Sequence, residues 1–224
     1  MKLNEVVPWG RSLAEYKLMF DLSEADLKKH ILGCGDGPAS FNSELTAIGG
    51  QVISVDPIYQ FSGAQIKQRI EATRDTMIPQ VWAAKQRFKW DFFKDPDNLG
   101  RVRLNVMREF LQDFEAGLKV GRYLPAALPN LPFRDGQFDL CLCSHLLFLY
   151  SEQLSQQFHI EAIQELLWVA TEVRIFPLLG LDGQPSPHRE AIRAHFEEAG
   201  YKVQVRKVGY EFQVGGNEMM VFSV

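Results

Sequence analysis

The sequence lacks the features that would mark a secreted, membrane-bound or nucleic-acid-binding protein. Its first residues, MKLNEVVPWGRS, have no apolar core of the kind found in signal peptides. The longest apolar run, LCLCSHLLFLY at 140–150, is shorter than the ~20 residues that a membrane-spanning helix needs. The net charge of −4 gives no general attraction to nucleic acid or to anionic membranes. We therefore expect a cytoplasmic protein, folded as a single domain over residues 1–224, without a membrane partner.

Cysteine is also scarce, and its spacing predicts neither disulfides nor a metal site. The three cysteines, Cys34, Cys141 and Cys143, form no CxxC pair and no even set. Cys141 and Cys143 would share one face of a strand, where two thiols chelate a metal poorly, and no His/Cys cluster completes a tetrahedral set. We expect reduced thiols, buried as small apolar side chains, and no metal.

What the sequence does contain is an alternation of apolar strands with helices. The expected strands lie at 30–32, 51–57, 122–126, 138–145, 171–178, 201–208 and 218–224, the last two forming a C-terminal antiparallel hairpin. Pro38 is expected at the first position of a helix, and Ser151 is expected to cap another. Residues 60–118 carry no strand and predict a helical insert. Its helices are expected at about 62–78, 80–93 and 97–117, divided at Pro79 and at Asp95-Pro96. This order predicts an α/β fold with a mostly parallel sheet covered by helices on both faces.

A glycine-rich turn follows the first expected strand. ILGCGDGPAS at 31–40 places Gly33, Gly35 and Gly37 before a helix, and Asp56 follows the next strand. A turn that lets a ligand approach the backbone, followed by a carboxylate that accepts ribose hydroxyls, suits an adenosine-containing ligand. The dinucleotide pattern GxGxxG fails at Pro38, and the P-loop pattern fails because no lysine follows.

These stretches resemble the class I S-adenosylmethionine-dependent methyltransferases, a superfamily with a Rossmann-like fold. The resemblance rests on LGCGDG (32–37), VISVDP (52–57), LPFRDGQFDLCLCSH (131–145) and the closing hairpin. It implies S-adenosylmethionine as the cofactor. The implied cofactor-binding residues are Leu32, Gly33, Cys34, Gly35 and Gly37 at the amino-acid end, Asp56 and Pro57 at the ribose, Ala127 and Leu128 at the adenine, and Ser144 and His145 beneath the methionine. Two acids common in the family are missing, at Ile31 and within PAALPN.

Three further side chains have two interpretations each. Arg11, with Tyr16 nearby, is expected to fold over the cofactor and meet its carboxylate, or else to be a surface arginine. His145 is the candidate catalytic base, with activity rising through pH ~6.5, or a histidine that only shapes the pocket. Arg174, within an apolar strand, is either paired structurally or faces the substrate, because a buried guanidinium needs partners.

The methyl acceptor is not specified by any of these motifs. A sulfonium is already a good leaving group, so the protein mainly has to align the acceptor and exclude water. We expect a small-molecule acceptor and no nucleic acid, because residues 62–118 hold ten Lys/Arg against eight Asp/Glu. The alternatives are a protein or RNA methyltransferase that docks on the insert, and a cofactor-binding protein without turnover.

Overall fold

The computed structural model describes residues 7–223 and contains one seven-stranded sheet. The strand order is β3-β2-β1-β4-β5-β7-β6, and only β7 runs antiparallel to its neighbours. The strands are β1 (His30–Cys34), β2 (Gln51–Val55), β3 (Tyr123–Leu124), β4 (Leu140–Ser144), β5 (Glu172–Phe176), β6 (Lys202–Lys207) and β7 (Glu218–Ser223). This confirms the Rossmann-like α/β fold with a C-terminal antiparallel pair. The strand order reverses between β1 and β4, which is where ligands bind in open α/β sheets.

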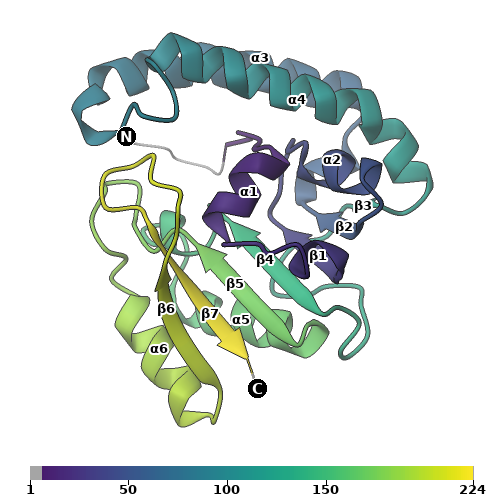
Figure 1. Cartoon of the computed structure of the whole chain (residues 1–224), viewed down its shortest axis with the longest axis vertical. Coiled ribbons are helices and arrows are strands. Elements are labelled where there is room, and N and C mark those ends of the chain that lie inside the picture. The colour runs from purple at the N-terminus through teal and green to yellow at the C-terminus, as the bar shows by residue number, and fades with distance from the viewer. Residues whose placement is uncertain (1–6, 224) are drawn as a thin grey trace.

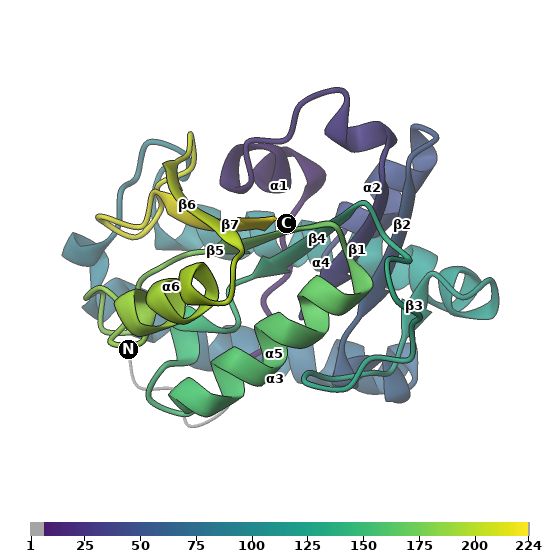
Figure 2. The same cartoon turned by 90° about the horizontal axis from the view of Figure 1, so that it is seen from below.

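Helices cover both faces of the sheet, because the strands are apolar on both sides (Figure 2). On one face lie α1 (Leu13–Met19) and α2 (Phe41–Ala47), and on the other α5 (Gln156–Val169) and α6 (Arg189–Glu198). Within β4, Leu140 and Leu142 pack into the core on the side of α1 and α2. Cys141 and Cys143 pack into the core on the side of α5 and α6. All three cysteines are free and buried, so the thiols serve as core side chains.

The predicted helical insert at 60–118 is confirmed, but its internal boundaries differ from expectation. Helix α3 (Gly63–Ala83) continues through Pro79, and α4 (Pro96–Lys119) is the second long helix. Pro79 is exposed, while Met77 and Val81 on either side are buried. Tertiary packing of that apolar face therefore outweighs the cost of proline within a helix. The helix expected at 80–93 is absent: η3 (Lys85–Arg87) and an irregular segment stand in its place.

Two helix starts were also predicted wrongly. Helix α2 begins at Phe41, because the glycine turn extends past Pro38. Helix α5 is capped by Ser155, whose hydroxyl accepts a hydrogen bond from the amide of Phe158. Ser151 instead donates to the carbonyl of Phe148 in the preceding turn.

The insert lies across the carboxyl ends of the parallel strands (Figure 1). Its base packs on the sheet through an aromatic cluster, formed by Tyr59, Phe110, Phe114 and Tyr123. Its tip contacts the loop between β6 and β7 through two backbone hydrogen bonds. The amide of Lys89 donates to the carbonyl of Phe212 at 2.7 Å, and the amide of Val214 donates to the carbonyl of Arg87 at 3.0 Å. The insert is thus fastened at both ends over one edge of the sheet.

A buried ion pair joins the insert to the N-terminal segment. Arg103 of α4 binds both carboxylate oxygens of Glu15 in α1 at 2.6 Å, and both side chains are about 1% exposed. Tyr210 donates to Glu15, and Arg103 also donates to the carbonyl of Gly10. This network fixes the segment before α1 beneath the insert. No helix within residues 7–223 is long and apolar enough to cross a membrane.

Candidate functional site

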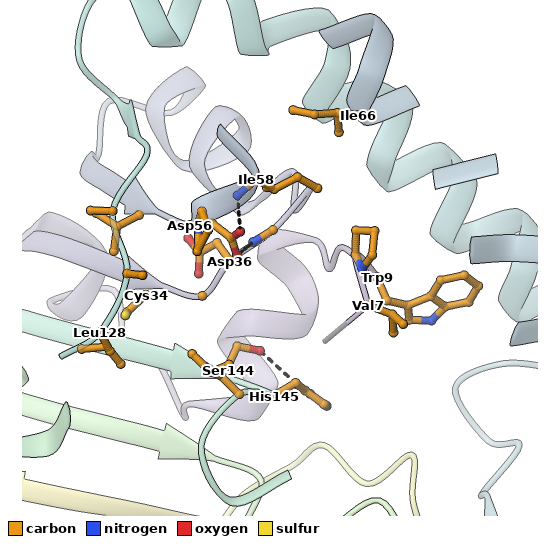
Figure 3. Close-up of a pocket in the computed structure, with 18 of the residues that line it drawn as sticks. Val7, Trp9, Cys34, Asp36, Asp56, Ile58, Ile66, Leu128, Ser144 and His145 are labelled. Atoms are coloured by element: carbon orange, nitrogen blue, oxygen red, sulfur yellow. Dashed lines mark hydrogen bonds between the residues drawn. The ribbon is translucent and has the colours of Figure 1, made fainter. Parts of the chain in front are cut away.

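A cavity of about 710 Å³ opens at the carboxyl ends of β1 and β4, beneath the insert. Its walls come from the glycine turn, the end of β2, residues 126–128, the end of β4, the segment before α1, and α3 (Figure 3). Cavities of this size suit a cofactor or small ligand. Among the described residues, no group of three or more His, Cys, Asp or Glu side chains could hold a metal ion.

The glycine turn forms the floor of the cavity, and two of its glycines are required by backbone conformation. Gly35 and Gly37 have φ values of 71° and 54°, which side chains rarely tolerate. Cys34 also lines the cavity, whereas Leu32 and Gly33 do not. Leu32 points into the α5-side core. Gly33 is needed for another reason: a Cβ there would lie 1.9 Å from the carboxylate of Asp36.

Asp36, between two of the glycines, is a site residue that sequence reasoning missed. It is buried and accepts hydrogen bonds from the hydroxyls of Tyr16 at 2.7 Å and Ser54 at 2.6 Å. Burial raises the pKa of Asp36 to about 6 against the effect of these hydrogen bonds, and the nearby Asp56 adds to the rise. No local pattern indicates this, because both partners lie 18 or more residues away in the chain.

Asp56 stands where β2 ends, with its carboxylate at the cavity wall. One oxygen accepts from the amide of Ile58 and the other from the amide of Gly37, each at 2.9 Å (Figure 3). Burial raises its pKa, and these two amides oppose the rise. Asp56 therefore caps the turn and also lines the cavity, and its binding of ribose hydroxyls stays a prediction. Each oxygen retains a lone pair that a ligand hydroxyl can reach.

Arg11 brings a cation to the cavity wall. One Nη donates to the carbonyl of Trp9 at 2.9 Å, and its Nε is buried with no partner among the described residues. Burial, and then the neighbouring Arg103, lower its pKa. The segment carrying Arg11 crosses directly over the glycine turn, since a Cβ on Gly10 would lie 2.0 Å from the carbonyl of Pro38. Tyr16 lines the cavity too, but its hydroxyl is committed to Asp36.

His145 projects from the end of β4 in a strained conformation. Its φ of 52° is uncommon for a side chain, and its amide is held by the carbonyl of Phe176 at 2.6 Å. Nδ1 lies 2.9 Å from the hydroxyl of Ser144 (Figure 3), and the described residues form no other hydrogen bond to the ring. Burial, followed by the charges of Arg11 and Arg103, lowers the pKa of His145 well below 6.5. The imidazole is therefore neutral at pH 7, and its pH response should lie below the value expected from sequence.

The remaining predicted residues divide between the cavity and the scaffold. Pro57, Ala127 and Leu128 line the cavity. Arg174 is structural: its guanidinium binds Asp26 and Glu172 and donates to a backbone carbonyl of the α1 region. Side chains from outside the motifs that also line the cavity include the apolar Val7, Trp9, Ile58 and Ile66 and the polar Gln60, Gln65 and Arg69.

Comparison with known proteins gives one relative by sequence and several by fold. No protein-family model matches the chain. The uncharacterised protein MJ0045 of Methanocaldococcus jannaschii is 33% identical over 222 residues, which cover 99% of this chain and 97% of that protein. The magnesium protoporphyrin IX methyltransferase ChlM of Synechocystis PCC 6803, crystallised with S-adenosylhomocysteine, matches with a TM-score of 0.50 at 12% identity, covering 94% of this chain and 81% of that one. A methyltransferase of Aquifex aeolicus matches with a TM-score of 0.46 at 15% identity, covering 93% and 92%. The match to the Synechocystis enzyme establishes the fold.

Proposed function

Since the chain belongs to the same family as MJ0045 of Methanocaldococcus jannaschii and has the Rossmann-like fold of the class I methyltransferases, we propose that it is an S-adenosylmethionine-dependent methyltransferase acting on a small molecule. The observation that carries the proposal is the polarity of the cavity. The wall holds a carboxylate acceptor, Asp56, and a guanidinium, Arg11, whose buried Nε has no partner among the described residues; a second guanidinium, that of Arg69, also lines it.

The wall residues fit the parts of this cofactor in order. Asp56 would accept the ribose hydroxyls, and the apolar side chains of Ile58 and Leu128 would flank the adenine. Arg11 would bind the amino-acid carboxylate and so satisfy its Nε, which otherwise costs the desolvation of a charged group. The absence of an acid within PAALPN leaves the adenine to backbone and apolar contacts.

When bound, S-adenosylmethionine supplies a methyl group on a positively charged sulfur. The residues at this part of the cavity would have to hold the acceptor atom in line with that methyl group and away from water. His145, neutral at pH 7, can take the proton of an acceptor hydroxyl, thiol or amine through Nε2 in the tautomer in which Nδ1 carries the ring proton and donates it to the Ser144 hydroxyl. The insert would keep water from the reacting atoms.

The test of this proposal is calorimetric titration with S-adenosylhomocysteine, with NAD as the comparison ligand. We expect binding of the first and none of the second. Asp56→Asn should weaken binding by about 1.5–3 kcal/mol, the range for a hydrogen bond to a charged group, in a protein that remains folded. Asp135→Asn, on an exposed turn, is the matched control and should bind normally. Binding of NAD without a response to S-adenosylhomocysteine would refute the proposal.

Two finer points accompany the proposal. We favour turnover of a small acceptor over action on RNA or protein and over binding without catalysis. The reason is that the insert is attached over the cavity at its base, by the aromatic cluster, and at its tip, by hydrogen bonds to the β6–β7 loop. A cytoplasmic location is favoured by the three free, buried thiols. Salt-dependent binding of RNA to the purified protein would contradict the first point.

A further inference from the structure

A second, smaller cavity lies beyond Arg11 and His145, under the tip of the insert. Its volume is about 110 Å³, and it shares Val7, Trp9, Arg11 and His145 with the large cavity. Figure 3 shows Val7, Trp9 and His145 at the end of the large cavity away from Cys34 and Leu128. The small cavity thus begins where the proposed cofactor would present its methyl group.

The walls of this second cavity are largely aromatic and aliphatic. They include Phe88, Phe176, Tyr210, Phe212, Leu149 and Leu181. Phe88 and Phe212 stack at 4.7 Å between centroids, which joins the insert to the β6–β7 loop at this point. An apolar cavity of ~150 Å³ in another protein holds one benzene molecule. At about 110 Å³ the space is smaller than that, so it suits at most one ring or one branched chain and is too small for a segment of a macromolecule.

The charges that the described residues place on these walls are all of one sign. Arg11, Arg87 and Arg103 line the cavity, and no Asp or Glu of residues 7–223 does. Glu15 neutralises Arg103, and under the proposed function the cofactor carboxylate neutralises Arg11. Arg87 has only a backbone partner, the carbonyl of Leu181 at 2.9 Å, and forms no ion pair among the described residues.

A buried donor on the same walls, the Nε of Arg103, has no acceptor among the described residues, and an unmade hydrogen bond of a buried charged group is costly. The Nε of Arg11 also has none, but under the proposed function the cofactor carboxylate meets it. A ligand that brings an oxygen acceptor would satisfy a donor that the described residues leave unpaired. A cationic ligand would be repelled by the positive charge of Arg87, which no described carboxylate neutralises. The positively charged sulfur of the proposed cofactor would add to this repulsion.

We propose, on the basis of the proposed function, that this cavity binds the methyl acceptor and that the acceptor is a small carboxylic acid with one apolar ring or branched chain. The apolar part lies among the aromatic side chains, the carboxylate pairs with Arg87, and the atom to be methylated lies beside His145. Arg87 is then the residue that selects an anionic acceptor over a neutral or cationic one of the same shape.

Benzoate is a suitable probe, with benzamide as the neutral and benzylamine as the cationic analogue. Each is titrated into protein saturated with S-adenosylhomocysteine, so that the large cavity is filled, and the melting temperature is followed. Benzoate should raise the melting temperature at millimolar concentration, while the two analogues should not. Equal responses to all three compounds, or no response to benzoate, would overturn the inference.

Four variants locate the binding. Arg87 is half-buried, so Arg87→Gln should weaken benzoate about tenfold through loss of the charge pair, whereas Arg87→Lys should retain most of the affinity. Leu149→Trp, which fills the cavity, should abolish it. Arg108→Gln, on the exposed side of α4, is the matched control and should bind normally.

The variants also separate the inference from the proposed function. Binding of S-adenosylhomocysteine should be unchanged in all four. Normal benzoate affinity in both Arg87→Gln and Leu149→Trp would overturn the acceptor assignment and leave the methyltransferase proposal standing. Failure of the unaltered protein to bind S-adenosylhomocysteine would overturn the proposed function itself.

Discussion

Replacing Asp36 by asparagine should make the protein less stable in acid and more stable at neutral pH. The carboxyl of Asp36 has a pKa of about 6 in the folded protein, against 3.8 as the ordinary value. The folded state therefore binds more protons than the unfolded state between these two values. Since stability falls with rising pH wherever the folded state binds more protons, Asp36 costs stability progressively as pH rises through this window.

The size of the effect follows from the pKa difference. A difference of about 2.2 units at ~1.36 kcal/mol per unit gives about 3 kcal/mol when the window has been crossed. About 2 kcal/mol of this change falls between pH 4.5 and pH 8. Asparagine removes the titration but mismatches one of the two hydrogen bonds, from Tyr16 or Ser54, at a cost of about 1 kcal/mol.

The assay is urea unfolding of both proteins at several pH values, with equal m-values required for the comparison. The difference in unfolding free energy, variant minus unaltered protein, should grow by about 2 kcal/mol from pH 4.5 to pH 8. Parallel stability curves over that range would refute the assignment of a raised pKa to Asp36.

Asp26→Asn serves as the control. Burial acts to raise the pKa of Asp26, but hydrogen bonds from Lys29 and Ser23 outweigh it, and the pKa is about 2. The stability that Asp26 contributes is present above 3.8 and is lost only as pH falls toward 2. Asp26→Asn should therefore show a nearly constant deficit over the range in which Asp36→Asn changes.

Three further predictions concern the base, the buried ion pair and the N-terminal crossing. If His145 is the base, the acid limb of the rate profile should lie well below pH 6.5, and His145→Asn should lower turnover roughly 10²–10⁴-fold with cofactor affinity nearly unchanged; near-normal turnover with weakened cofactor binding would favour a structural role. Arg103→Leu should lower the free energy of unfolding, measured in urea, by about 3–5 kcal/mol, because it leaves Glu15 buried and unpaired. Adding Glu15→Leu should recover most of this loss. A loss below about 1 kcal/mol in the single variant would contradict burial of the pair. Gly10→Ala, whose Cβ would collide with the carbonyl of Pro38, should displace Arg11 and weaken S-adenosylhomocysteine binding by about 1.5–3 kcal/mol in calorimetry; unchanged affinity would show that Arg11 does not reach the cofactor.

The sequence alone determined the features that depend on neighbours in the chain. Apolar strands can be predicted from their composition and length. The turn after β1 is recognisable because its backbone requires Gly35 and Gly37. Asp56 could be placed because it directly follows a strand whose end had to face the ligand. The insert was recognisable from a long stretch without strands, whereas its inner boundary was not, because Pro79 is tolerated only through the packing of the residues beside it.

Tertiary structure decided the contacts between residues far apart in the chain. The pairing of Glu15 with Arg103 spans 88 residues, and the bonds between the insert tip and the β6–β7 loop span more than 120. The same holds for Asp36, whose raised pKa arises from burial beneath α1, and for Arg11, whose place depends on the crossing at Gly10. No local pattern encodes such contacts, because burial and charge at each point come from whichever distant segments the fold brings there.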